Sequence, residues 1–99
     1  MKYGLSDSVI EKIIKVFRRN SNIQEAIIFG SRSKGNYREG SDIDITLKGS
    51  ITFDNLLRIE SEIDDQMLPY KLDVSIFEKL DNKKLIEHIN RVGKIFYQK

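Results

Sequence analysis

Three aspartates in this sequence of 99 residues stand where carboxylates can converge. Asp42 and Asp44 are two positions apart in a stretch that alternates polar and apolar side chains, so on a β-strand both point to the same face. Carboxylates a few ångströms apart repel each other by roughly 1 to 4 kcal/mol unless a cation lies between them. Mg²⁺ or Mn²⁺ is the natural occupant, because both ions prefer carboxylate and phosphate oxygens. Taken alone, the Asp-x-Asp pair also fits two solvated acids on an exposed strand.

Asp73 is the third acid. It has the parity of Ser75 in a second alternating stretch, residues 71–77, whose other side is apolar. If both stretches are strands of one sheet that is packed on one side, all three carboxylates lie on its open side. Aspartate is disfavoured in strands, so this arrangement favours a functional purpose, although Asp73 by itself also fits a solvated edge. We therefore predict a metal site formed by Asp42, Asp44 and Asp73.

A glycine and a serine end the buried stretch that precedes these acids. Residues 23–29 are apolar and rich in β-branched side chains, which is typical of a strand buried on both faces. Without a Cβ, Gly30 lets phosphate oxygens approach backbone N–H groups at the start of a short helix. Ser31 adds a hydroxyl, and Arg32 and Lys34 add positive charge nearby. We predict that these four residues, 30, 31, 32 and 34, bind phosphate; the two basic side chains also fit a solvated helix.

Apolar residues recur at helical spacing in two segments that flank these motifs. The first segment, residues 9–17, follows Ser8, which together with Glu11 is typical of a capping box. The second segment begins at Thr52 or Asp54, and Pro69 is expected to stop it. Its predicted apolar stripe consists of Phe53, Leu56, Leu57, Ile63 and Met67.

A third helix is predicted to begin after Asp81, its N-cap, and to end at Gly93. A short last strand is expected at residues 95–97. His88, the only histidine, is far from every motif in the sequence, and we interpret it as a surface residue. Three tyrosines are expected to serve packing rather than nucleotide stacking or self-modification: Tyr37, Tyr70 and Tyr97.

The order of these elements predicts one α+β domain spanning residues 1–99, with a small mixed β-sheet, helices packed on its apolar face and the other face open. The longest apolar run, Ala26 to Phe29, is far shorter than the roughly 18 residues of a membrane span, so no membrane segment is expected. The N-terminus has no apolar signal core, and we expect a cytoplasmic protein.

Composition excludes several other kinds of site. The chain has no cysteine, which excludes disulfides, thiolate nucleophiles and zinc–sulfur centres. The net charge of +2 and the absence of a dense basic stripe argue against nucleic acid as a direct partner. Acids are concentrated in residues 54–65 and bases in residues 79–99, as on solvated helix faces or on surfaces that face a partner.

Together, Gly30-Ser31, Asp42-Ile43-Asp44 and the distant Asp73 resemble the signature of the minimal nucleotidyltransferases (MNT) of the DNA polymerase β superfamily. The resemblance extends over nearly the whole chain. Residues 86–97 look like those of short bacterial and archaeal members that are encoded beside a small helical HEPN-type or substrate-binding protein. The resemblance implies a palm-like sheet, metal-dependent nucleotidyl transfer and such a helical partner.

The resemblance also implies a role for each matching residue. Asp42 and Asp44 would hold two metal ions, and Asp73 would complete the ion that activates the attacking hydroxyl. Gly30 and Ser31 would bind the pyrophosphate side of a nucleoside triphosphate, with ATP as the expected donor. The expected reaction is transfer of AMP to a hydroxyl of the partner protein or of a small acceptor. The alternative is an antitoxin that acts by binding alone, but a binding module has no physical need for three converging acids.

Overall fold

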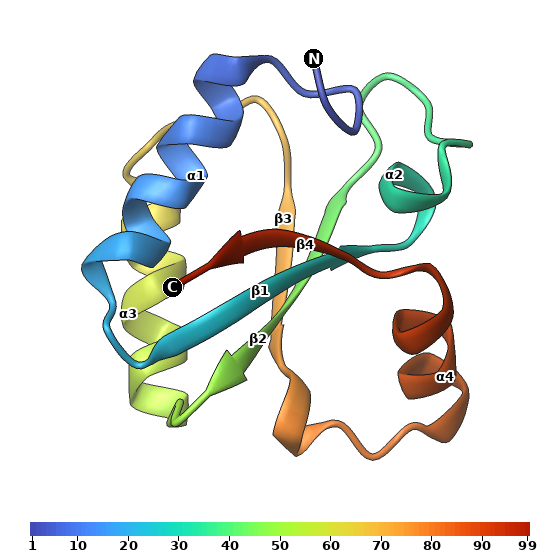
Figure 1. Cartoon of the computed structure of the whole chain (residues 1–99). Helices are drawn as coiled ribbons and strands as arrows, with labels where there is room; N and C mark the ends of the chain where they lie inside the picture. Colours follow the sequence, from blue (N-terminus) through green and yellow to red (C-terminus); the bar gives the residue numbers. More distant parts are fainter.

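In the computed structural model, which describes residues 1–99, helices and strands alternate around one β-sheet (Figure 1). None of the helices is both long enough and apolar enough to cross a membrane. The elements are α1 (Asp7–Arg19), β1 (Ile23–Phe29), α2 (Ser31–Lys34), β2 (Ile43–Gly49), α3 (Phe53–Asp64), β3 (Leu72–Ile76), the 3₁₀ helix η1 (Phe77–Lys79), α4 (Lys83–Val92) and β4 (Lys94–Gln98). The predicted α+β class is confirmed.

The sheet has four strands in the order β3-β2-β1-β4. Strand β2 runs parallel to β3, whereas β1 is antiparallel to both β2 and β4, so the sheet is mixed as predicted. The register places Asp44 between Phe29 of β1 and Asp73 of β3. Pairing therefore brings together residues that the sequence separates by long segments.

Helices α1 and α3 cover one face of the sheet and form the main core with it (Figure 1). This core contains 16 buried residues, among them the alternating apolar positions of β2 that the sequence predicted. Ile13 and Phe17 of α1 and Ile59 of α3 are fully buried. Burying one such side chain stabilises the fold by about 1.5–3 kcal/mol, so this face holds the sheet rigid.

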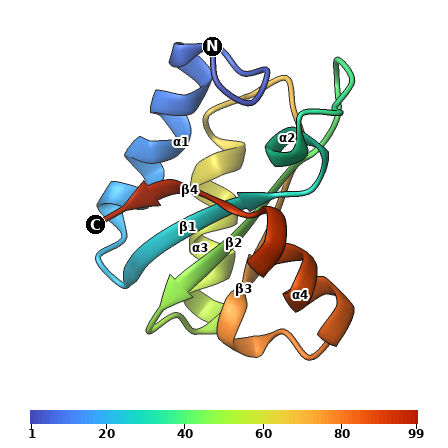
Figure 2. The ribbon, with the colours of Figure 1, turned by 45° about the vertical axis from the view of Figure 1, so that its right-hand side comes forward.

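Helix α4 lies on the opposite side of the sheet from α1, as Figure 1 and Figure 2 both show. Ile27 of β1 and Ile89 of α4 are buried, yet neither belongs to the main core. A Cβ added to Gly93 would lie 2.7 Å from Cγ2 of Ile27, so the end of α4 packs closely on β1. The face that the sequence left open is therefore partly covered by α4.

Two helices begin at residues other than the predicted caps. Helix α1 is capped by Ser6, whose hydroxyl accepts a hydrogen bond from the Val9 N–H (3.2 Å), and not by Ser8. Helix α4 is capped by the Asn82 side chain and not by Asp81. Both residues of each pair are good N-caps, and the tertiary fold decides where the first turn begins.

Helix α3 begins as predicted but buries a different stripe. Thr52 forms a capping box with Asn55, and Ile59 and Ile63 are the buried residues of the helix. The predicted stripe is wrong at three positions that are largely exposed: Phe53 (64%), Leu57 (64%) and Met67 (87%). The helix also ends at Asp64, well before Pro69, so Met67 belongs to a loop.

Candidate active site

Gly30 makes the turn between β1 and α2 and lies directly against Asp44. Its φ of 75° and ψ of −154° belong to a region that is essentially restricted to glycine. A Cβ added at this position would overlap the Oδ2 atom of Asp44. A glycine is therefore required here both by the backbone conformation and by the approach of the loop to this carboxylate.

Helix α2 is a single turn that begins immediately after Gly30. The Ser33 hydroxyl donates a hydrogen bond to the Gly30 carbonyl (3.1 Å), and the Gly35 N–H donates to the Ser31 carbonyl (2.9 Å). Ser31 is half-buried and Lys34 is exposed, so both side chains can be reached from solvent. Of the residues predicted to bind phosphate, Ser31 and Lys34 are therefore accessible, whereas the Gly30 N–H already donates to Nε2 of His88.

Arg32 is different, and its predicted phosphate contact is corrected by the structure. The side chain is only 2% exposed. Its Nε and Nη2 atoms donate to the Ser41 carbonyl (3.1 and 2.8 Å), and Nη1 donates to the Tyr3 carbonyl (2.9 Å). The guanidinium carbon lies 5.3 Å from the centroid of the Tyr37 ring and 4.9 Å from that of Tyr70. The planar cation is thus enclosed by carbonyls and aromatic rings, and it holds the fold together instead of facing a ligand.

The three aspartates gather at one edge of the sheet. Asp44 and Asp73 are register partners in the parallel β2–β3 ladder, and Asp42 immediately precedes β2. Burial raises the pKa of Asp44, the nearby charges of Asp73 and Asp42 raise it further, and His88 lowers it. These carboxylates therefore lie close enough to repel one another, as the alternation of the two strands predicted.

The three aspartates do not form a preformed metal-coordination site. No group of three or more His, Cys, Asp or Glu side chains has the geometry to hold a metal ion. Asp42 and Asp73 are exposed and can turn, because mutual repulsion favours rotamers that separate the charges. The available ligands are carboxylate oxygens, with no sulfur among them. Mg²⁺ and Mn²⁺ prefer such oxygen ligands. The residues therefore fit such an ion.

His88 belongs to this site, which corrects its interpretation as a surface residue. Its Nε2 atom accepts a hydrogen bond from the Gly30 N–H (3.2 Å). Its ring is half-buried and stands edge-on to Phe29, with ring centroids 6.1 Å apart. The contact joins residues 58 positions apart. Only the pairing of β4 with β1, which begins at Ile28 and Lys94, could have indicated that the preceding helix returns to this end of β1.

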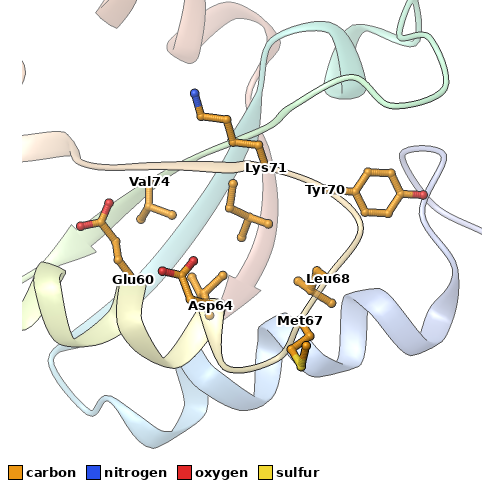
Figure 3. Close-up of a pocket in the computed structure, with 9 residues that line it drawn as sticks. Glu60, Asp64, Met67, Leu68, Tyr70, Lys71 and Val74 are labelled. Atoms are coloured by element: carbon orange, nitrogen blue, oxygen red, sulfur yellow. The ribbon is translucent and has the colours of Figure 1, made fainter.

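A groove of about 460 Å³ lies elsewhere, between α3 and the β3 edge (Figure 3). Its lining includes Ile63, Leu68, Tyr70, Leu72 and Val74, with Glu60 and Asp64 at the side of α3. None of the predicted site residues lines it, and Leu72 and Val74 point away from the face that carries Asp73. Lys71 is the one basic residue of this lining, which is otherwise apolar or acidic, and the groove lies on the side of β3 opposite to Asp73. We therefore do not assign the nucleotide to it.

Comparison with known proteins assigns the chain. Residues 11–99 match the protein family described as "Polymerase beta, Nucleotidyltransferase". The chain belongs to this nucleotidyltransferase family. The membership predicted from Gly30-Ser31, Asp42, Asp44 and Asp73 is therefore confirmed.

Individual proteins that are similar to this chain support the same family assignment. A Methanocaldococcus jannaschii protein named as a candidate protein adenylyltransferase is 33% identical over 84 residues, which cover 76% of this chain and 81% of that protein. A crystal structure of a toxin–antitoxin pair with AMP-PNP is 26% identical (TM-score 0.72) and covers 91% of this chain and 73% of the matched one. A structure of a tri-AMPylated Shewanella oneidensis HEPN toxin with an MNT antitoxin has a TM-score of 0.68 at 22% identity, covering 96% and 74%, and shares the fold.

Proposed function

We propose that this nucleotidyltransferase transfers AMP from ATP to a hydroxyl group of a helical HEPN-type partner protein. One observation carries the proposal: Asp44 lies beside Asp73 in the β2–β3 ladder while the Gly30 turn presses against its carboxylate. The turn proposed to receive phosphate and the acids proposed to bind metal thus lie at the same edge of the sheet. The relatives with AMP-PNP or with an AMPylated toxin support the choice of nucleotide and partner.

The residues of the site divide the work as follows. Asp42, Asp44 and Asp73 would hold two Mg²⁺ or Mn²⁺ ions. When bound, such ions stabilise the entering and leaving oxygens of an in-line displacement at phosphorus. Ser31 and the N–H groups at the start of α2 would receive the β- and γ-phosphates beside Gly30, whose own N–H donates to His88. The exposed Lys34 would add positive charge beside them. The acceptor oxygen forms a bond to the α-phosphorus, and the bond to the leaving pyrophosphate breaks.

The partner is needed to complete the site. Asp42 and Asp73 are exposed to solvent, and α4, which lies on this side of the sheet, packs on β1. Holding an attacking hydroxyl in line is worth roughly 7–11 kcal/mol, which an exposed edge of a sheet does not supply by itself. The basic residues of α4 form the candidate docking surface, because α4 lies on this side of the sheet, whereas α3, which carries most of the acids of residues 54–65, covers the opposite face. We expect the partner to contribute both the acceptor and the wall around it.

The test is co-expression with the partner followed by intact-mass measurement. With the wild-type chain, the partner should gain one AMP mass for each modified site. Asp44→Asn should abolish this gain, whereas Asp81→Asn, which changes an exposed acid outside the site, should not. ATP affinity measured by calorimetry should also fall when EDTA removes the divalent ions, because three carboxylates then repel the triphosphate.

The same experiment tests the alternative, an antitoxin that acts by binding alone. The similar toxin–antitoxin complexes keep that reading open. If wild type forms a stable complex but the partner gains no mass in the presence of ATP and Mg²⁺, binding is the function. If Asp44→Asn transferred AMP at the wild-type rate, the assignment of the acids would be wrong.

A further inference from the structure

Histidine 88 connects the last helix to the turn that precedes α2. It contacts that turn in two ways: Nε2 accepts the Gly30 N–H at 3.2 Å, and the ring meets the edge of Phe29, the last residue of β1. Gly30 in turn lies against Oδ2 of Asp44. His88, Gly30 and Asp44 therefore form a continuous row of contacts from α4 to the acidic cluster.

We infer that His88 is a positioning residue that sets the place of the Gly30 backbone relative to the Asp44 carboxylate. The inference rests on the proposed function, because it assumes that the turn at Gly30 receives the triphosphate through neighbouring N–H groups, the Gly30 N–H being bonded to His88, and that Asp44 holds metal. His88 would act through Gly30 and would not touch the reacting atoms.

The turn needs such support because it cannot fix its own geometry. Glycine gives up more conformational freedom on folding than any other residue, and Gly30 adopts a conformation that only glycine tolerates. Helix α2 is a single turn of four residues, too short to hold the orientation of its own first residue. An external hydrogen bond to the Gly30 N–H is the simplest restraint.

Helix α4 is a firm base for this restraint. Ile89, the neighbour of His88, is 3% exposed, and the close packing of Gly93 on Ile27 fixes the far end of the helix on β1. On its other side the ring accepts the Gly30 N–H at Nε2. The geometry of the ring is therefore set by packing on one side and by the Gly30 N–H on the other.

The inference separates binding from chemistry. A displaced Gly30 turn weakens the grip on the β- and γ-phosphates, while the carboxylates and the acceptor stay in place. Loss of the restraint should therefore raise the KM for ATP much more than it lowers kcat. A merely structural histidine would lower the amount of active protein and leave KM unchanged.

Two substitutions and one control test the inference. His88→Leu keeps the size of the side chain but removes the acceptor, whereas His88→Gln retains an acceptor near the position of Nε2. Asn90→Ala changes an exposed residue of the same helix and serves as the control. Thermal unfolding checks that each variant is folded before the comparison.

Two measurements are made on the complex with the partner. Amide hydrogen exchange at Gly30 should be about tenfold faster in His88→Leu, the effect expected from losing one hydrogen bond, and within about threefold of wild type in His88→Gln. The KM for ATP should rise about tenfold in His88→Leu with kcat within about threefold, and the glutamine variant should restore most of the loss.

Three outcomes would overturn the inference. Wild-type Gly30 exchange and KM in a folded His88→Leu would show that the contact restrains nothing. A fall of kcat at constant KM would make His88 a catalytic group. Equal defects in the leucine and glutamine variants would show that the acceptor atom is irrelevant. If instead wild type itself transferred no AMP, the proposed function would fail, while Gly30 exchange would still test the hydrogen bond.

Discussion

The segment from Gly30 to Asp44 carries a cation near one end and an anion at the other. The two differ in whether the protein neutralises their charge. At one end the Arg32 cation is buried, and it is bonded to two backbone carbonyls and enclosed by two tyrosine rings. At the other end Asp44 is half-buried, and burial together with two neighbouring acids raises its pKa. A charge whose bonds are all made within the chain stabilises the fold, whereas like charges left together remain available for a ligand.

The same comparison separates Arg32 from Lys34, which lie on the same short helix. The Arg32 guanidinium donates three hydrogen bonds to backbone carbonyls and lies near two tyrosine rings. Lys34 is exposed and close to Ser31. Positive charge next to a glycine turn is therefore no sufficient sign of a phosphate contact, because the surroundings decide which cation is exposed to solvent.

The largest expected effect is at the acidic end. Asp44→Asn should lower AMP transfer by at least about 10²- to 10³-fold, the usual cost of removing one preorganised electrostatic group from an active site. The fold should stay intact, since the change also relieves repulsion by Asp42 and Asp73. Transfer is measured by intact mass and folding by circular dichroism. If this variant lost its structure, Asp44 would be needed for folding, which would contradict the view that the acids serve ligand binding and Arg32 serves stability.

At the basic end the effect should be on stability. Arg32→Met should lower the free energy of unfolding by about 2–4 kcal/mol, because the Ser41 and Tyr3 carbonyls lose their donors inside the protein. Urea denaturation measures the change, and Arg38→Met, at an exposed position of the same loop, is the control. A variant as stable as wild type but with weaker ATP binding would restore Arg32 as a phosphate ligand.

Lys34 tests whether the exposed cation of α2, unlike the buried Arg32, contributes to ATP binding. Lys34→Ala should weaken ATP binding by roughly three- to tenfold, the effect of one solvent-exposed contact to phosphate, and should leave the unfolding midpoint unchanged. Calorimetric titration with Mg²⁺ present gives the affinity. Exposed Lys84→Ala on α4 is a matched control for the loss of charge. Equal affinities in both variants would place Lys34 outside the nucleotide site.

The smallest effect concerns stability as a function of pH. The pKa of Asp44 in the folded chain is raised above its ordinary value of 3.8, mainly by burial. Its contribution to stability is therefore fully present below pH 3.8 and is lost as the pH rises through the raised pKa. Asp44→Asn should be more stable than wild type at neutral pH, and the difference should shrink in acid. Urea denaturation at several pH values tests this, and a difference that grew in acid would reverse the sign.

Local periodicity was enough to predict much of this protein. The period of two in residues 42–48 and 71–77 predicted the shared face of Asp44 and Asp73, because successive side chains of a strand must alternate. The turn at Gly30 and the amphipathic helices were also predicted, since backbone sterics and the helical period act over a few residues. The signature made by these residues led to the correct family.

The tertiary structure decided what depends on contacts between distant segments. Arg32 and Lys34 are equivalent as local sequence, and only the arrival of Tyr3, Ser41 and Tyr70 buries the first of them. His88 joined the site because β4 pairs with β1 and carries α4 back over the sheet. Burial, hydrogen-bond partners and repulsion are set by these long-range contacts. The sequence could therefore predict which side chains share a face, but not which charges the fold leaves free.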